Sequence, residues 1–269
     1  MNLKNLFTRT IAGVIYIAIV LCGIFGGQYA FLVVFGMLLA ISLFEFFRMV
    51  GKNEQVRISK TLNIVSGLAI FAAALLFPQS ALLLTALYLL FQLASTLFIN
   101  KHNGLLSAAY SLFGQFYITL PFILLSLIYA ANETINQKLI LAIFIFIWIS
   151  DTAAFLVGSL FGKHKLFERI SPKKTIEGFI GGVILATSAG FLFAELIPEF
   201  SLLFWIGFGL ITSMIGTLGD LFESLVKRTY EVKDSGALIP GHGGMLDRID
   251  SFLFAVVAVY CYMQLTLWF

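Results

Sequence analysis

The chain has 269 residues, of which 60% are hydrophobic and 12% charged, and its mean hydropathy is +0.99. A soluble domain carries roughly a quarter charged residues, so this chain has too little polar surface to cover a globule in water. The composition excludes a soluble enzyme, a disordered chain and a disulfide-rich secreted domain. The net charge of +3 gives no reason to expect a nucleic-acid partner.

Long continuous apolar runs predict an all-α, polytopic membrane protein, since about 20 apolar residues cross the hydrocarbon core of a bilayer. A membrane β-barrel would instead show short alternating segments. We predict about nine transmembrane helices, at residues 10–27, 29–50, 62–78, 80–99, 105–131, 138–157, 179–197, 201–222 and 249–269.

The polar segments are spread unevenly along the chain. Residues 1–269 are interpreted as a single membrane domain, because no low-complexity linker divides them. Within it, residues 1–100 carry no motif. Residues 101–178 end in a basic loop that contains Ser-Pro-Lys-Lys-Thr, and residues 179–269 contain the densest group of polar side chains.

The basic residues define an orientation. If the N-terminus is cytoplasmic and the spans alternate, every lysine and arginine except Lys138 falls in a cytoplasmic segment. This asymmetry is what the positive-inside rule predicts, and the reverse orientation would invert it. The outer loops are short, so we expect the protein to act from its cytoplasmic side or within the membrane.

Two predicted cytoplasmic loops, 158–178 and 223–248, concentrate lysines, arginines, glycines and carboxylates. Lysine and arginine suit phosphate groups, and glycines let backbone amides approach an anion. Carboxylates next to phosphates suit Mg²⁺, which commonly bridges the two. Zinc fits poorly, because neither cysteine is near any of the three histidines.

Individual residues within these regions have competing interpretations. Asp151 and Asp220 each follow a long apolar run, where an ionisable group is costly, and this favours a functional site. Glu45 lies three residues before Arg48 and is predicted to pair with it locally. Gly178 and Gly182 have the spacing of a helix-packing motif. The Ser-Pro start of residues 171–178 also reads as a helix entry with caps.

A specific pattern fills residues 224–250. It reads S-x-x-K-R, four residues, K-D-x-G, and then P-G-H-G-G-x-x-D-R-x-D. The fixed positions are Ser224, Lys227, Arg228, Lys233, Asp234, Gly236, Pro240, Gly241, His242, Gly243, Gly244, Asp247, Arg248 and Asp250. This resembles the signature of the phosphatidate cytidylyltransferases (CDP-diacylglycerol synthases) of bacterial type.

Three upstream motifs agree with this resemblance: the D-T-x-A segment at 151–154, S-P-K-K-T-x-E-G at 171–178, and Gly219-Asp220. Phe155 stands where the family usually has tyrosine, so no hydroxyl is available there. The resemblance implies transfer of the cytidylyl group of CTP to phosphatidate, with Mg²⁺, giving CDP-diacylglycerol and pyrophosphate. It also implies a homodimer in the bacterial cytoplasmic (inner) membrane, with the active site facing the cytoplasm.

The resemblance and the chemistry of the side chains together assign roles. Asp220, Asp247 and Asp250 are the expected metal ligands, and a second cation is compatible with two sets of phosphate oxygens. The expected catalytic residues are Asp220, Asp247, Lys227, Arg228, Lys233, His242 and Arg248. The expected substrate-binding residues are Ser171, Lys173, Lys174, Thr175, Glu177, Ser224, Asp234, Gly241, Gly243, Gly244 and Asp151.

Two other functions compete with this assignment. A CTP-dependent lipid kinase would transfer the γ-phosphoryl group, so its products would be a phospholipid and CDP. A membrane transporter would also contain many spans and intramembrane acids. The transporter is disfavoured because the polar residues gather at one face of the membrane, whereas a transport path would need them along its length.

Overall fold

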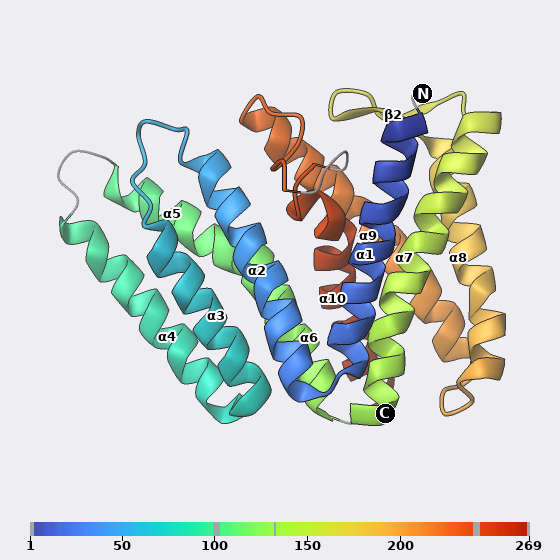
Figure 1. Ribbon diagram of the computed structural model, residues 1–269, viewed down its shortest axis with the longest axis horizontal. Helices are drawn as coiled ribbons and strands as arrows, with labels where there is room; N and C mark the ends of the chain where they lie inside the picture. Colours follow the sequence, from blue (N-terminus) through green and yellow to red (C-terminus); the bar gives the residue numbers. More distant parts are fainter. Residues whose placement is uncertain (1–2, 99–102, 132, 239–242, 268–269) are drawn as a thin grey trace. The chain divides into compact units, whose positions relative to one another are not determined.

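The computed structural model describes residues 3–98, 103–131, 133–238 and 243–267 and is almost entirely helical (Figure 1). The helices are α1 (Leu3–Phe25), α2 (Gln28–Val50), α3 (Lys60–Leu76), α4 (Pro78–Ser95), η1 (Thr96–Phe98), α5 (Gly104–Gly114), η2 (Gln115–Thr119), α6 (Leu120–Ala131), α7 (Glu133–Phe161), α8 (Ile176–Leu196), α9 (Leu202–Thr229) and α10 (Leu246–Leu267). Between α7 and α8, strands β1 (Lys165–Phe167) and β2 (Ser171–Thr175) pair in antiparallel fashion.

The helices confirm an all-α polytopic membrane protein. Within the described residues, seven are long and apolar enough to cross a bilayer: Gln28–Val50, Pro78–Phe98, Gly104–Ala131, Ile135–Phe161, Ile176–Leu196, Leu202–Thr229 and Leu246–Thr266. Two shorter apolar helices, Thr10–Phe25 and Lys60–Leu76, lie where the first and third spans are predicted. A total of nine spans and the cytoplasmic N-terminus stay predictions.

The contacts of the chain group it into two compact units. The first comprises Met1–Glu133 and Tyr230–Arg248, and the second comprises Thr134–Thr229 and Ile249–Phe269. The signature segment therefore contributes to both units. The interpretation of the chain as a single membrane domain stays a prediction.

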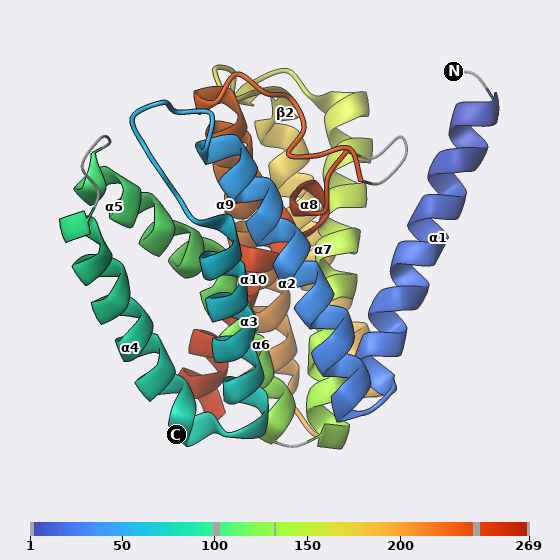
Figure 2. The same ribbon diagram turned by 60° about the vertical axis from the view of Figure 1, so that its left-hand side comes forward.

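In the first unit, α3 packs against α2, α4 and α6, and these helices can be followed in both views (Figure 2). Their core is rich in aromatic rings. The ring of Phe31 lies 4.6 Å from that of Phe35 and 4.2 Å from that of Tyr129, and Phe71 packs edge-on against Phe122. Burial of such rings fixes α2 in place, and α2 carries Glu45 and Arg48 near its end.

In the second unit, small residues let helices approach closely. A Cβ atom at Gly178 would collide with the carbonyl oxygen of Ala154, and one at Gly182 would collide with that of Ser150. The helix-packing interpretation of this pair of glycines is therefore confirmed, and their partner is α7 of the same chain. A second aromatic cluster, around Phe146 and Trp205, holds α7, α8 and α9 together.

The structure moves several predicted boundaries. Helix α7 continues to Phe161, so Asp151 lies well inside a helix. Residues 171–175 form a strand, and the helix entry is at Thr175, whose Oγ1 accepts a hydrogen bond from the backbone N–H of Gly178 at 3.1 Å. Helix α9 extends to Thr229, which places Lys227 and Arg228 in its last turn and shortens the second polar loop.

Candidate active site

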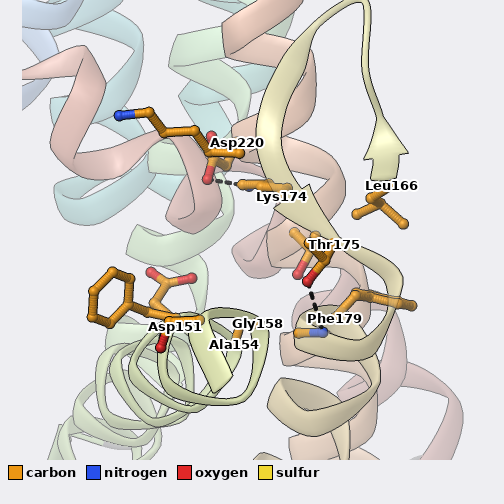
Figure 3. A pocket seen from close by; sticks show the side chains of 13 residues that line it. Asp151, Ala154, Gly158, Leu166, Lys174, Thr175, Phe179 and Asp220 are labelled. Atoms are coloured by element: carbon orange, nitrogen blue, oxygen red, sulfur yellow. Dashed lines mark hydrogen bonds and ion pairs between the residues drawn. The ribbon is translucent and has the colours of Figure 1, made fainter. Parts of the chain in front are cut away.

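A cavity of about 350 Å³ opens in the second unit, among α7, the β-hairpin, the start of α8 and α9 (Figure 3). Four of the predicted substrate-binding residues and the predicted ligand Asp220 line it. Its lining residues are Asp151, Ala154, Phe155, Gly158, Ser159, Leu166, Lys173, Lys174, Thr175, Gly178, Phe179, Thr217 and Asp220. The structure therefore brings together side chains from three motifs that are up to about seventy residues apart.

Lys174 and Asp220 form an ion pair at this cavity, visible in Figure 3. Both lysines of β2 line the cavity, but they differ in exposure, since successive side chains of a strand point to opposite faces. Lys173 is exposed, whereas Lys174 is half-buried and reaches Oδ2 of Asp220 on α9. The other Asp220 oxygen, Oδ1, lies 3.5 Å from the hydroxyl of Ser224, one helical turn later.

The carboxylates of Asp250 and Asp151 interact electrostatically with that of Asp220 or with each other. Asp250 on α10 is partly buried and interacts with the charges of Asp220, Asp151 and Lys227. Three carboxylates in one region repel each other and are stabilised by cations placed among them. In this chain Lys174 and Lys227 supply part of that positive charge.

The last turns of α9 hold a buried ion pair between Glu223 and Lys227. The side chain of Glu223 is 0% exposed and that of Lys227 is 12% exposed. Because the acid and the base are one helical turn apart, the pair directs the lysine along α9. Arg228, at the next position, is exposed near the negative end of the helix dipole.

The β-hairpin is tied to the start of α8 by Glu177. Its carboxylate accepts hydrogen bonds from the backbone N–H groups of Lys163 and His164, and the His164 ring nitrogen Nδ1 lies 2.6 Å from it. Glu177 is not among the residues that line the cavity of Figure 3. Ser171, at the other end of β2, pairs with Phe167 and likewise does not line it.

In the first unit, Asp247 organises the part of the signature loop that precedes α10. Its Oδ2 accepts hydrogen bonds from the backbone N–H of Ser235 (2.9 Å), the Ser235 hydroxyl (3.0 Å) and the backbone N–H of Gly244 (2.7 Å). Gly243 has a φ of 85°, and a Cβ there would press against the same carboxylate oxygen. Glycine at 243 is therefore required by both backbone conformation and space.

The remaining signature residues are placed as follows. Lys233, Asp234 and Arg248 are exposed. Gly244 is buried against Ser235. Gly241 and His242 lie outside the described residues.

The prediction that Glu45 pairs locally with Arg48 is wrong. The sequence also did not lead us to expect Glu45 beside the signature residues. The predicted local pair with Arg48 is replaced by contacts with the signature loop: Arg48 contacts Ser235, and Glu45 contacts Ser235, Met245 and Leu246. Glu45 is 3% exposed within an apolar helix. The burial cost used to single out Asp151 and Asp220 applies to it equally, so the signal was present in the sequence.

The carboxylates near the cavity suit Mg²⁺ better than they suit a metal whose whole coordination shell is supplied by protein side chains. Within the described part of the chain, no three Asp, Glu, His or Cys side chains are grouped closely enough to enclose a metal. Mg²⁺ usually takes one or two carboxylates and completes its shell with water and substrate phosphates. Asp220 and Asp250 fit that requirement, whereas Oδ2 of Asp247 is already held by three donors.

Comparison with known proteins identifies the family. Residues 7–266 match the cytidylyltransferase family. The phosphatidate cytidylyltransferase of Staphylococcus haemolyticus is 36% identical over 268 residues, which cover 93% of this chain and 94% of the relative. That of Staphylococcus saprophyticus is 35% identical, covering 92% and 95%. That of Staphylococcus aureus is 40% identical over 61% of this chain and 62% of the relative. The chain therefore belongs to the phosphatidate cytidylyltransferase (CDP-diacylglycerol synthase) family of membrane enzymes.

Proposed function

We propose that the chain transfers the cytidylyl group of CTP to phosphatidate, giving CDP-diacylglycerol and pyrophosphate. The observation that carries the proposal is the cavity lined by Lys173, Lys174, Asp151 and Asp220, in a chain whose curated relatives are phosphatidate cytidylyltransferases. Such a cavity combines phosphate-binding cations with carboxylates that suit a divalent cation.

In the proposed reaction, a phosphate oxygen of phosphatidate forms a bond to the α-phosphorus of CTP. The bond from that phosphorus to the bridging oxygen of the β-phosphate breaks, and its electron pair leaves with pyrophosphate. A phosphate monoester has a second pKa near ~6 and is already largely dianionic at neutral pH, so no strong general base is needed. The obstacle is repulsion between anions, which is overcome by cations and positioning.

Different residues are proposed to bind the different phosphate groups. Lys173 and Lys174 bind phosphate oxygens at the cavity, and Lys227, Arg228, Lys233 and Arg248 serve the triphosphate and the phosphatidate headgroup. The backbone at Gly241, Gly243 and Gly244 lets the loop approach a phosphate closely. His242 hydrogen-bonds phosphate or protonates the departing pyrophosphate.

We propose Asp220 and Asp250 as the Mg²⁺ ligands. Asp247, one turn before Asp250 in α10, is proposed as a third through its second carboxylate oxygen. When bound, Mg²⁺ neutralises charge on the phosphates and orients them. The chain itself keeps Lys174 paired with Asp220 at the cavity.

The direct test supplies the purified protein in detergent with phosphatidate, Mg²⁺ and CTP labelled at the α-phosphate. We expect label to enter the lipid and EDTA to stop the incorporation, because both carboxylate ligands need the metal to hold the nucleotide. Transfer of label from γ-labelled CTP to lipid would instead support a lipid kinase. If no label reaches lipid from either nucleotide in a folded protein, the proposal is wrong and transport should be measured in vesicles.

We also propose that the N-terminus and the cavity face the cytoplasm of a bacterial inner membrane. Single-cysteine variants test this orientation: Lys165→Cys on the β-hairpin and Gln79→Cys at the start of α4. Both are made after Cys22 and Cys261 are replaced by serine. A membrane-impermeant maleimide should label Gln79→Cys in intact spheroplasts and label Lys165→Cys only after lysis. The opposite pattern would invert the proposed orientation.

A further inference from the structure

The carboxylate of Glu45 lies beneath the signature loop, although the two are about 190 residues apart in the sequence. Glu45 Oε1 accepts a hydrogen bond from the backbone N–H of Met245 at 3.0 Å. Oε2 accepts from the backbone N–H of Leu246 at 2.9 Å and lies 2.8 Å from the Ser235 hydroxyl. The whole side chain is 3% exposed, so its charge is offset mainly by these donors.

The loop is shaped to admit this carboxylate. A Cβ atom at Gly236 would collide with Oε1 of Glu45, and a Cβ at Gly244 would collide with both Glu45 oxygens. These two signature glycines therefore leave room for Glu45. Arg48, one turn further along α2, donates from Nη2 to the carbonyl oxygen of Ser235 at 3.3 Å.

Glu45 performs the work of a helix cap from a different helix. Helix α10 begins at Leu246, and the first N–H groups of a helix have no partner within that helix. An anion at this position satisfies them and interacts favourably with the positive end of the helix dipole. The residue that begins α10 is thus fixed by α2.

Ser235 connects Glu45 with Asp247. Its hydroxyl lies within hydrogen-bond distance of Oε2 of Glu45 and of Oδ2 of Asp247. A hydroxyl has one proton, so it donates to one carboxylate at a time. Its backbone N–H donates to Asp247 as well. Glu45 and Asp247 are therefore linked through one shared residue.

We propose that Glu45 is a positioning residue: it anchors Ser235, Met245 and Leu246 to α2 and thereby fixes Asp247 at the start of α10. The proposal deepens the proposed function and rests on it only where activity is measured. The anchoring itself can be measured without any substrate. The motif-free N-terminal helices thus gain a specific role in the reaction.

The test compares Glu45→Gln with the matched control Glu54→Gln, an exposed acid in the loop after α2. Glutamine has the size of glutamate, but its amide N–H₂ group faces backbone donors on one side of the pocket. Hydrogen exchange by mass spectrometry should show the amides of Met245 and Leu246 exchanging about tenfold faster or more in Glu45→Gln. Glu54→Gln should leave them unchanged.

The kinetic readout is the Mg²⁺ concentration that gives half-maximal cytidylyl transfer. A displaced Asp247 should raise it about tenfold or more in Glu45→Gln, whereas a smaller folded fraction would lower only the maximal rate. If Glu45→Gln does not fold, Ser235→Ala removes only the shared hydroxyl and should shift both readouts in the same direction.

Unchanged exchange at Met245 and Leu246 would overturn the anchoring. Faster exchange with an unchanged Mg²⁺ requirement would overturn the positioning role. If the wild-type protein transferred no cytidylyl group, the exchange measurement would still decide the anchoring, so failure of the proposed function is distinguishable from failure of this inference.

Discussion

Replacing Asp247 by asparagine is expected to lower cytidylyl transfer on the order of 10³-fold while the protein still inserts and folds. The side chain keeps its shape, and its amide oxygen can still accept from Ser235 and Gly244, which donate to Oδ2 in the wild type. The negative charge is lost, so the position can no longer help to hold a divalent cation. Initial rates with α-labelled CTP and phosphatidate measure the loss.

The matched control for this variant is Arg57→Gln. Arg57 is exposed and lies in the loop between α2 and α3, outside the motif segments, and its backbone N–H donates to the Ser107 hydroxyl whatever its side chain. Its activity should stay close to that of the wild type. Thermal unfolding and gel filtration in detergent should be the same for both variants. If Asp247→Asn kept more than about a tenth of the activity, its assignment as a metal ligand would be wrong.

Lys174→Gln is expected to reduce kcat/KM for CTP by about 10²-fold. The wild-type ammonium is ion-paired with Asp220 at the cavity, with side chains 29% and 28% exposed. Its loss removes a cation from the proposed phosphate site and leaves the charge of Asp220 uncompensated beside that of Asp250. Steady-state rates at varied CTP and phosphatidate concentrations measure this effect.

Lys138→Gln is a control of the same chemistry away from the cavity. Lys138 pairs with Glu199 at 3.0 Å, with side chains 40% and 37% exposed. The hydrogen bond from this ammonium lowers the pKa of the Glu199 carboxyl, so that carboxyl is ionised at neutral pH. Exposed pairs contribute little to stability, and this variant should retain nearly full activity. Equal rates for Lys174→Gln and Lys138→Gln would remove Lys174 from the site.

Local regularities made much of the fold predictable. A run of apolar residues long enough to cross a bilayer is nearly always helical there, because every backbone N–H and C=O must be paired within the segment. Seven described helices confirm this reasoning. The signature was equally local, since its fixed spacings in residues 224–250 could be matched without knowledge of the fold. Family membership followed from them and is confirmed.

The errors arose where polar segments met the ends of helices. Apolar patterning ended the span before Lys227, yet α9 continues to Thr229, because a polar last turn costs a helix little at the membrane surface. The Ser-Pro-Lys-Lys-Thr segment became a strand, since it pairs with Lys165–Phe167, a partner that carries no recognisable signal. That strand brings Lys174 to Asp220 and leaves Lys173 exposed at the same cavity.

The sequence by itself determined the membrane class and the family, because each depends on composition or on fixed local spacing. The residues proposed for phosphate and metal chemistry come from the same local motifs and stay predictions. Only the tertiary structure decided the partners. Lys174 meets Asp220 across 46 residues, and Glu45 meets the signature loop across about two hundred. Spacing along a chain does not encode such pairings. They arise when helices pack and a buried carboxylate must find donors wherever the fold provides them.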